Sequence, residues 1–189
     1  MTAQLPRGSR GDLPTGREQV RAAILTAATE LFAERGPAAT SIRDIAARSK
    51  INHGLVFRHF GSKENLVGAV LDHLGAELAE LLRSQAPADS IEHAMDIQTR
   101  VMARAVLDGY PAGQLQQHFP NVVDVLNRVR GTFDDETQAR IAVANALALQ
   151  FGWRLFEPVV RAATGLEDLP EADIRDAMRA SLARLLEPR

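Results

Sequence analysis

Apolar residues recur at intervals of three and four positions along most of the chain, the spacing that places them on one face of an α-helix. The alternating β-branched runs that mark strands do not occur. The first helix is predicted to begin at Thr15, which stands at capping-box spacing from Glu18, and to end at Gly36 and Pro37. Its predicted buried stripe consists of Val20, Ile24, Ala28, Leu31 and Phe32.

Three more helices are predicted before Pro87: two short ones, and a third of about six turns. Each begins at a polar residue of the kind that caps helix N-termini. The predicted caps are, in order, Thr40 or Ser41, Asn52, and Ser62. The short helices are expected to turn Ile42, Ile45, Ala46, Ile51, Val56 and Phe60 inward. Gly61 separates the second short helix from the long one.

The second half predicts longer helices, over 89–108, 111–117, 120–130, 134–164 and 170–187. Pro158 is expected to kink or interrupt the helix over 134–164. That helix is apolar on two faces. The face with Ala142, Ala146 and Ala163 packs either against a second subunit or inside the protomer's own core. The last helix is amphipathic, with Ile174, Met178, Leu182 and Leu185 on one face.

This pattern predicts an all-α protein, in which an N-terminal three-helix domain is joined by a linking helix to a larger helical domain. Residues 1–14 show no periodicity and are expected to form a mobile arm. Residues 15–61 are expected to form the first domain. Residues 62–189 are expected to form the second.

Composition narrows the class of protein. The chain has 189 residues, 46% hydrophobic and 24% charged, which is ordinary usage for a globular protein. It has no cysteine, so disulfides, thiolate metal sites and cysteine nucleophiles are excluded. There is no signal-like apolar segment at the start and no membrane-spanning apolar run. A cytoplasmic protein without membrane association is expected.

Charge is distributed unevenly. Residues 1–63 carry ten basic and five acidic residues, whereas the remainder carries twelve basic and nineteen acidic residues. The first part is therefore net positive, although the whole chain has a formal charge of -2. This asymmetry indicates either a polyanion-binding module at the N-terminus or a chance clustering of surface charges.

Residues 40–66 show the logic of a helix-turn-helix. A short helix ends in a tight turn at Ser49 and Lys50, and the next helix starts with a polar cap. With Val56 and Phe60 inward, this second helix directs small, aromatic and basic groups outward. These groups are His53, Gly54, Phe57 and Arg58. Such a surface is typical of a recognition helix that enters the major groove of DNA.

Four motifs now stand in order along the chain: FAERG at 32–36, TSIRDIA at 40–46, VFRHF at 56–60 and GSKENL at 61–66. In type, order and spacing they resemble the DNA-binding region of TetR-family transcriptional regulators, over about residues 15–66. Two positions depart from the family pattern. Lys50 stands where the turn usually has glycine, and Phe57 stands where tyrosine is usual.

The resemblance implies that DNA contacts are made by Thr40, Ser41, Arg43, Asn52, His53, Gly54, Leu55, Phe57, Arg58, His59 and Lys63. Elementary chemistry agrees with several of these roles. An arginine such as Arg43 can donate two hydrogen bonds to guanine, and Leu55 can contact a thymine methyl group. Lys63, in the first turn of its helix, is suited to a phosphate. Phe57 keeps the aromatic ring but lacks the hydroxyl that the family implies for a phosphate bond.

An enzyme is the alternative class of protein, but the sequence contains none of the catalytic motifs sought. The chain lacks paired Glu-x-x-His motifs, His-Glu-x-x-His, and both glycine-rich nucleotide-binding motifs. The five histidines do not cluster. We therefore expect no catalytic activity, no metal and no cofactor.

We interpret the second half of the chain as a sensor domain, an oligomerisation domain or both. Large soft and aromatic residues are candidates for a pocket that takes an unknown, largely apolar small-molecule effector. These are Met102, Tyr110, His118, Trp153 and Phe156, each of which could equally be ordinary core. Gly68 and Gly75 in the linking helix either allow a bend that transmits the effector signal or merely permit close packing.

The prediction from the sequence is a sequence-specific DNA-binding transcriptional regulator, a ligand-responsive repressor that binds a palindromic operator as a homodimer. Repression is what the family resemblance implies. The alternative is an effector-independent DNA-organising or scaffold protein that carries the same module.

Overall fold

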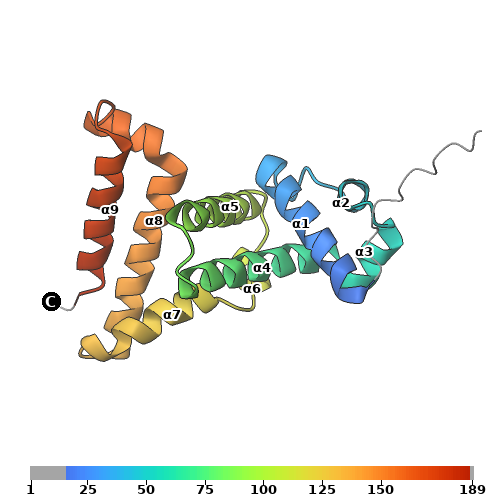
Figure 1. The fold of residues 1–189 in the computed structure, drawn as a ribbon, viewed down its shortest axis with the longest axis horizontal. Coiled ribbons are helices and arrows are strands. Elements are labelled where there is room, and N and C mark those ends of the chain that lie inside the picture. The colour runs from blue at the N-terminus through green and yellow to red at the C-terminus, as the bar shows by residue number, and fades with distance from the viewer. Residues whose placement is uncertain (1–15, 188–189) are drawn as a thin grey trace, which may run out of the picture.

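The computed structural model of the protein describes residues 16–187, which form helices and no strand (Figure 1). The helices are α1 (Arg17–Arg35), α2 (Ile42–Ser49), α3 (His53–Phe60), α4 (Lys63–Arg83), α5 (Ala88–Leu107), α6 (Ala112–Leu115), α7 (Pro120–Val129), the short 3-10 helix η1 (Arg130–Thr132), α8 (Glu136–Thr164) and α9 (Glu171–Leu185). The all-α prediction is confirmed. From α5 onward the predicted helix ends differ from the observed ones by at most two residues. The predicted arm, 1–14, lies outside the described residues.

Side-chain caps explain why α2, α3 and α4 begin where they do. The Ser41 side chain accepts a hydrogen bond from the Asp44 N–H, and the Asp44 carboxylate accepts one from the Ser41 N–H. As predicted, the side chains of Asn52 and Ser62 cap α3 and α4, each by accepting a hydrogen bond from a backbone N–H of the first turn. The prediction for α1 was wrong, because Gly16 occupies its N-cap position without a side-chain cap. Thr15 lies outside the described residues.

The turn between α2 and α3 is built although glycine is missing from it. Lys50 adopts the left-handed conformation, with φ of 57°, at the C-terminal end of α2. The following Ile51 N–H donates to the Ala46 carbonyl at 3.0 Å. These bonds satisfy the last carbonyls of α2, and the buried Ile51 holds the turn against the core. Lys50 therefore takes the backbone conformation for which glycine is usually chosen, although it carries a side chain.

One hydrophobic core connects the first six helices. Fully buried members include Ile24 and Phe32 of α1, Ile45 of α2, Val56 of α3, Leu66 and Leu71 of α4, and Val101 of α5. Burying each such side chain contributes ~1.5–3 kcal/mol of hydrophobic free energy. The helix-turn-helix unit is thus packed directly on α4 and α5, and the division of the chain at residue 61 stays a prediction.

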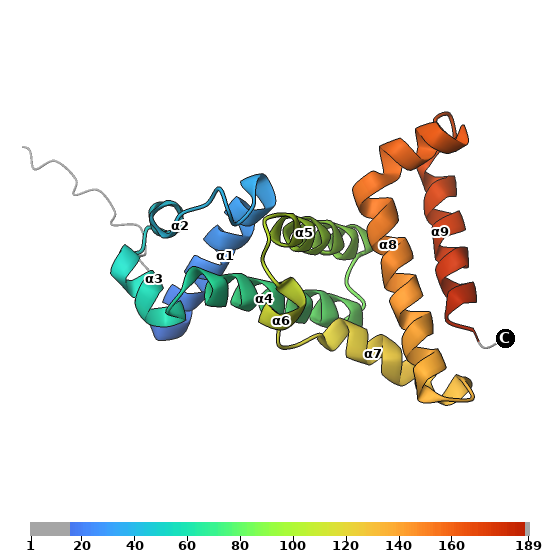
Figure 2. The same ribbon diagram turned by 180° about the vertical axis from the view of Figure 1, so that it is seen from behind.

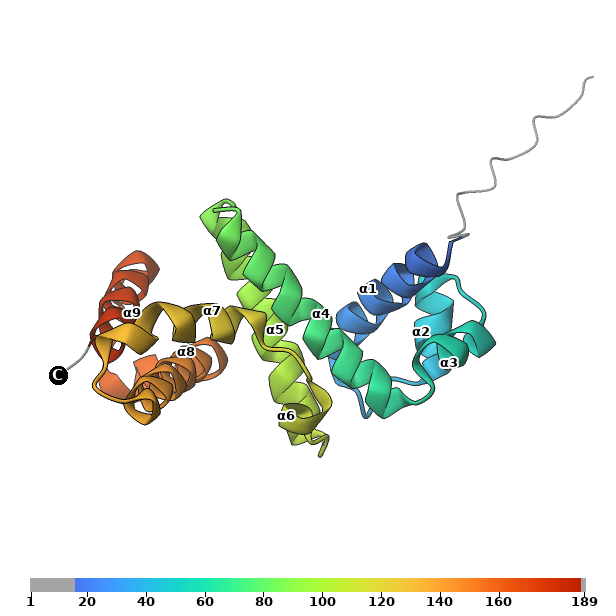
Figure 3. The same cartoon turned by 90° about the horizontal axis from the view of Figure 1, so that it is seen from below.

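The long helices α4 and α5 form the middle of the molecule. They cross and pack against each other (Figure 3), with α1–α3 at one end and α8 and α9 at the other (Figure 1). α6 and α7 pack along α4, as the view from behind also shows (Figure 2). α5 contacts both α1 and α8, so it spans the distance between the two ends.

Glycines in α4 allow another segment to approach closely. A Cβ atom at Gly68 would lie 2.5 Å from the Leu115 carbonyl oxygen, and one at Gly75 would lie 3.2 Å from the Gln116 side chain. The Asp72 carboxylate, on the same helix, accepts hydrogen bonds from the N–H groups of Gln117 and His118. Close packing is therefore the role that the structure gives these glycines, and α4 runs without interruption.

α8 agrees with its prediction at Pro158 and differs from it at the alanines. The helix continues through Pro158 without interruption but changes direction in its C-terminal part, as a kink would produce (Figure 1). Ala142 and Ala146, 8% and 7% exposed, are buried within the protomer, whereas Ala163 is exposed. The three alanines therefore do not form one outward face.

None of the helices over residues 16–187 has the length and apolar character that a membrane span requires.

Candidate nucleic-acid interface and ligand cavity

The recognition surface is formed by α3 and the start of α2. The caps at Ser41 and Asn52 fix where each helix begins, and the buried Ile45, Val56 and Phe60 fix which faces point inward. The outward residues are Arg43, Asn52, His53, Gly54, Phe57 and Arg58, all exposed. An open, mostly apolar hollow lies between the two helices and is lined by Ser41, Ile42, Arg43, His53, Gly54 and Phe57. The structure therefore brings most of the predicted DNA-binding residues to one surface.

Three predicted contact residues are placed differently. Thr40 is 0% exposed, and its hydroxyl donates to the Gly36 carbonyl at 2.8 Å, so the prediction of a DNA contact from Thr40 was wrong. Its hydroxyl instead holds the end of α1 to the start of α2. Leu55 is half-buried and packs partly against the core. His59 is also half-buried, beside the Phe60 ring.

The arginines of this unit fall into two groups. Arg48 pairs with Glu30 at 2.8 Å and Glu34 at 3.1 Å, and Arg35 pairs with Asp44 at 3.0 Å. The hydrogen bond from Arg48 lowers the pKa of Glu34, and the bonds from Glu34 and Glu30 raise the pKa of Arg48. These cations are neutralised on the face that α1 and α2 share.

The second group has no such partners. Within the part of the chain that the structure describes, Arg43, Lys50 and Arg58 make no ion pair and no side-chain hydrogen bond, and all three are exposed. Lys63, at the first position of α4, is half-buried, and its Nζ donates to the Ala38 carbonyl at 3.5 Å. Arg17 and Arg21 of α1 are exposed as well, and Arg21 lies over the Phe60 ring at 5.5 Å. Unpaired positive charge thus lies around α2, α3 and the start of α4, and on α1.

The segment between α1 and α2 is also held from the second half of the chain. Asp108, which follows α5, accepts a hydrogen bond from the Ala38 N–H at 2.7 Å. Gly36, with φ of 82°, leaves room for this carboxylate, because a Cβ there would lie 2.6 Å from the Asp108 oxygen. α5 therefore ends in direct contact with the helix-turn-helix unit.

A cavity of about 530 Å³ lies at the other end of α5, between α5, α8 and α9. Its apolar lining includes Met95, Trp153, Ile174, Met178 and Leu182. Its polar lining includes Glu92 and Asp96 of α5, Arg100, Arg154 of α8, and Glu171 and Arg175 of α9. The cavity is therefore amphipathic, and the expectation that the effector pocket is largely apolar stays a prediction.

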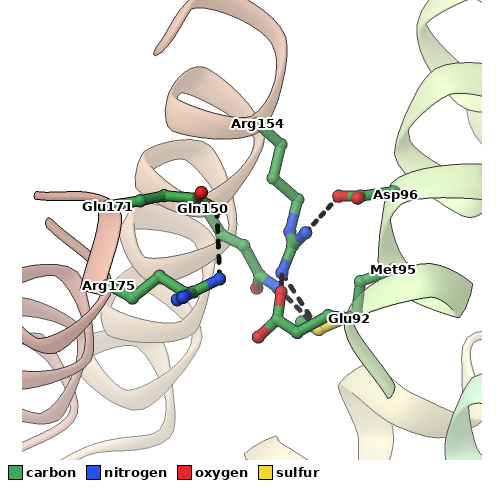
Figure 4. A network of polar contacts seen from close by, with 7 residues as sticks. All are labelled: Glu92, Met95, Asp96, Gln150, Arg154, Glu171 and Arg175. Carbon is green, nitrogen blue, oxygen red and sulfur yellow. Dashed lines mark hydrogen bonds and ion pairs between the residues drawn. The ribbon is translucent and has the colours of Figure 1, made fainter. Parts of the chain in front are cut away.

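Arg154 is the central polar residue of this cavity. Its guanidinium pairs with Glu92 and Asp96 and contacts the Met95 sulfur, which links α8 to α5 (Figure 4). The Arg154 side chain is 17% exposed, whereas the two carboxylate side chains are about half exposed. Its Nε is buried without a hydrogen-bond partner. Glu171 and Arg175 pair with each other along α9 on the opposite side of the cavity (Figure 4).

The five predicted pocket residues are not brought together. Trp153 lines the cavity, but Met102 and Tyr110 pack against the hydrophobic core. His118 is exposed near Asp72, and Phe156 is exposed on the outer side of α8. Sequence reasoning missed Glu92 and Asp96, for which the one available signal was their four-residue spacing on a helix.

This architecture defines a class of protein: a helix-turn-helix DNA-binding unit packed through two long helices onto a helical second half. Comparison with known proteins identifies the family. Residues 24–70 match the model described as bacterial regulatory proteins of the tetR family. The chain is 65% identical over 183 residues, 97% of each chain, to "HTH-type transcriptional repressor Rv3405c" of Mycobacterium tuberculosis (strain ATCC 25618 / H37Rv).

An equal identity and coverage relate it to "HTH-type transcriptional regulator Mb3439c" of Mycobacterium bovis. A solved TetR-family structure from Vibrio parahaemolyticus has the same fold, with a TM-score of 0.50 and 19% identity, covering 87% of this chain and 97% of that one. The protein belongs to the TetR family of transcriptional regulators, and the resemblance of its sequence motifs is confirmed.

Proposed function

We propose that the protein is a ligand-responsive transcriptional repressor that binds a palindromic operator as a homodimer. The relative named a transcriptional repressor supports this assignment, because it matches over nearly the whole chain. One observation carries the proposal: Arg43, Lys50 and Arg58 stand exposed and unpaired on the recognition surface, while Arg35 and Arg48 nearby are neutralised. Phosphates and base edges are the natural partners of such unpaired cations.

The proposed DNA contacts follow from exposure and chemistry. Arg43 is suited to a guanine, and Arg58 and Lys63 are suited to phosphates. The remaining contacts are proposed for Ser41, Asn52, His53, Gly54, Phe57 and His59, with Leu55 contributing only its exposed part. Thr40 is left out because it is buried.

The proposed dimer uses the outer face of α8. Exposed apolar residues stand there at helical spacing, namely Ile141, Phe156 and Val159. A Cβ at Gly152, on the same face, would meet open space. A second copy of this face is the fitting partner, because two recognition helices must reach successive major grooves ~34–36 Å apart.

The proposed effector site is the cavity between α5, α8 and α9. We expect an effector with both polar and apolar parts, because the lining has both. α5 provides a physical connection, since it carries Glu92 and Asp96 at the cavity and precedes Asp108 at the DNA-binding unit. An effector that changes the position of α5 would change the separation of the recognition helices.

DNA binding is tested with a duplex that the protein selects from a randomised library. We expect the double variant Arg43→Ala/Arg58→Ala to lose affinity for this duplex in fluorescence anisotropy. Arg128→Ala, which removes an exposed cation from α7, is the matched control and keeps wild-type affinity. Equal losses in both variants would contradict the proposed surface.

The effector role has a built-in probe, because Trp153 is the one tryptophan of the sequence and lines the cavity. Candidate amphipathic compounds are titrated while Trp153 fluorescence and operator affinity are measured in parallel. The proposal predicts that both change at the same ligand concentration. A compound that changes the fluorescence but leaves DNA affinity unchanged would contradict the coupling.

A further inference from the structure

The recognition surface has an apolar part that hydrogen bonding to DNA does not explain. The Phe57 side chain is 64% exposed. Among the described residues of α1–α3, no other large hydrophobic residue is exposed. Phe57 stands one helical turn from His53, and with Ile42 it gives the hollow between α2 and α3 its mostly apolar wall. An exposed aromatic ring beside an apolar hollow has no polar partner there, so an apolar group of a ligand is its complement.

The floor of this hollow is open because Gly54 has no side chain. A Cβ at Gly54 would have one neighbour within 4 Å, the Asn52 side-chain oxygen at 3.2 Å. Asn52 caps α3 through that same oxygen, which accepts from the Gly54 N–H at 2.8 Å. The hollow therefore lies directly over the first turn of the recognition helix, where base edges are approached.

The edges of the bases in the major groove offer one apolar group. These edges present hydrogen-bond donors and acceptors, and thymine alone among the four bases adds a methyl group, at C5. Arg43 and Ser41 at the rim of the hollow supply polar groups for a neighbouring base. An apolar hollow with a polar rim thus matches a thymine methyl next to a guanine that Arg43 contacts.

We propose that the hollow formed by Ile42, Gly54 and Phe57 is a subsite for a thymine methyl group and selects thymine at one position of each operator half-site. This inference rests on the proposed entry of α3 into the major groove. It assigns direct base recognition to Phe57 through its ring, so the missing tyrosine hydroxyl is not required for this role. Leu55 is not part of the subsite, because it does not line the hollow.

The test compares thymine with deoxyuridine, which lacks only the methyl group. The full-length protein first selects duplexes from a randomised library, and each thymine of the selected half-site is then replaced in turn by deoxyuridine. We expect one position per half-site at which the replacement weakens binding by roughly fourfold, the value of burying one methyl-sized group. Selection of a half-site without thymine would overturn the proposal.

The variant Phe57→Ala completes a double-mutant cycle between the ring and the methyl group. In this variant thymine and deoxyuridine duplexes should bind equally at the sensitive position. Phe57→Tyr keeps the ring and should keep the discrimination, and Gly54→Ala, which fills the floor, should reduce it. Leu107→Ala, at an exposed apolar residue that does not line the hollow, is the matched control and should keep the full fourfold difference.

The outcomes separate this proposal from the proposed function. If wild-type protein binds the selected duplex but is insensitive to every methyl group, the subsite is wrong and DNA binding stands. The subsite is also wrong if Phe57→Ala lowers the affinity for both duplexes by the same factor, so that the preference for thymine over deoxyuridine remains. The ring would then pack on the sugar and not on the methyl group. If no duplex is selected, the proposed function and the subsite both fail.

Discussion

The two ends of the molecule differ in how completely the apolar residues are buried within one protomer. In α1–α3, the buried faces meet a common core, and Phe57 on the recognition surface is the large exception among the described residues. In α8, by contrast, Ile141, Phe156 and Val159 stay exposed on one face. The first end is therefore complete as a structural unit, whereas the second has an apolar face that a further chain can cover.

The strongest way to break this comparison is a charge on the outer face of α8. Val159→Glu would place two carboxylates, one from each protomer, at the proposed interface. We expect dimerisation to weaken by about a hundredfold or more, because a buried unpaired charge is costly, and operator affinity to fall with it. Mass photometry or light scattering measures the assembly.

The same substitution elsewhere supplies the control. Val106→Glu changes a residue of similar exposure, 56% against 66% for Val159. Val106 lies at the C-terminal end of α5, away from α8. Val106→Glu should leave the dimer intact. Unaltered dimers in the Val159→Glu variant would place the interface away from this face of α8.

The next largest effect concerns the recognition surface. Arg43→Ala should cost ~1–3 kcal/mol of binding free energy on the operator and relax the preference at one base position per half-site. Arg43→Lys should restore only part of it, because lysine lacks the planar fork. Competitive binding to single-base operator variants measures the preference. Equal losses on operator and random duplexes would show that Arg43 contacts phosphate.

The same contrast decides what could be predicted from the sequence. In α1–α3 the signals are local: Ser41, Asn52 and Ser62 cap the helices that follow them, and the apolar spacing fixes the buried faces. The starts of α2, α3 and α4, the position of the turn and most of the exposed residues of α3 were therefore predictable, whereas the start of α1 was not. Thr40 was not, because its burial depends on how the ends of α1 and α2 meet.

The second half depends on contacts between distant positions. Arg154 meets Glu92 and Asp96 about sixty residues earlier in the chain, and no local pattern records this pairing. Periodicity showed that α8 is apolar on two faces, but it could not tell which face is covered by the protomer. For this reason the sequence left both partners open for Ala142 and Ala146, which the structure buries within the protomer.

A smaller effect sharpens the electrostatic part of the account. Lys63→Ala should weaken binding to all duplexes alike and reduce the slope of log affinity against log salt concentration by about one. Its Nζ is held near the α1–α2 segment through the Ala38 carbonyl, so the ammonium is already positioned at the start of α4. Binding isotherms at several salt concentrations give the slope. An unchanged slope would remove Lys63 from the phosphate contacts.

The smallest effect concerns the stability of the recognition unit in acid. Hydrogen bonding to the Ser41 backbone N–H lowers the pKa of Asp44 below its ordinary value of 3.8. The ionised carboxylate therefore stabilises the fold above that value, and this contribution is lost as the pH falls through the lowered pKa. Urea unfolding followed by circular dichroism should show a smaller loss of stability between pH 5 and pH 2 for Asp44→Asn than for the wild type. Equal losses would contradict the role of the capping box.

The comparison of the two ends is tested most directly by footprinting a selected duplex together with the stoichiometry of the complex. The account predicts two protomers on one duplex, protecting two half-sites related by a twofold axis. Their centres should lie ~34–36 Å apart, or a multiple of that distance, because each recognition helix occupies its own major groove. A single protomer on one asymmetric site would contradict it.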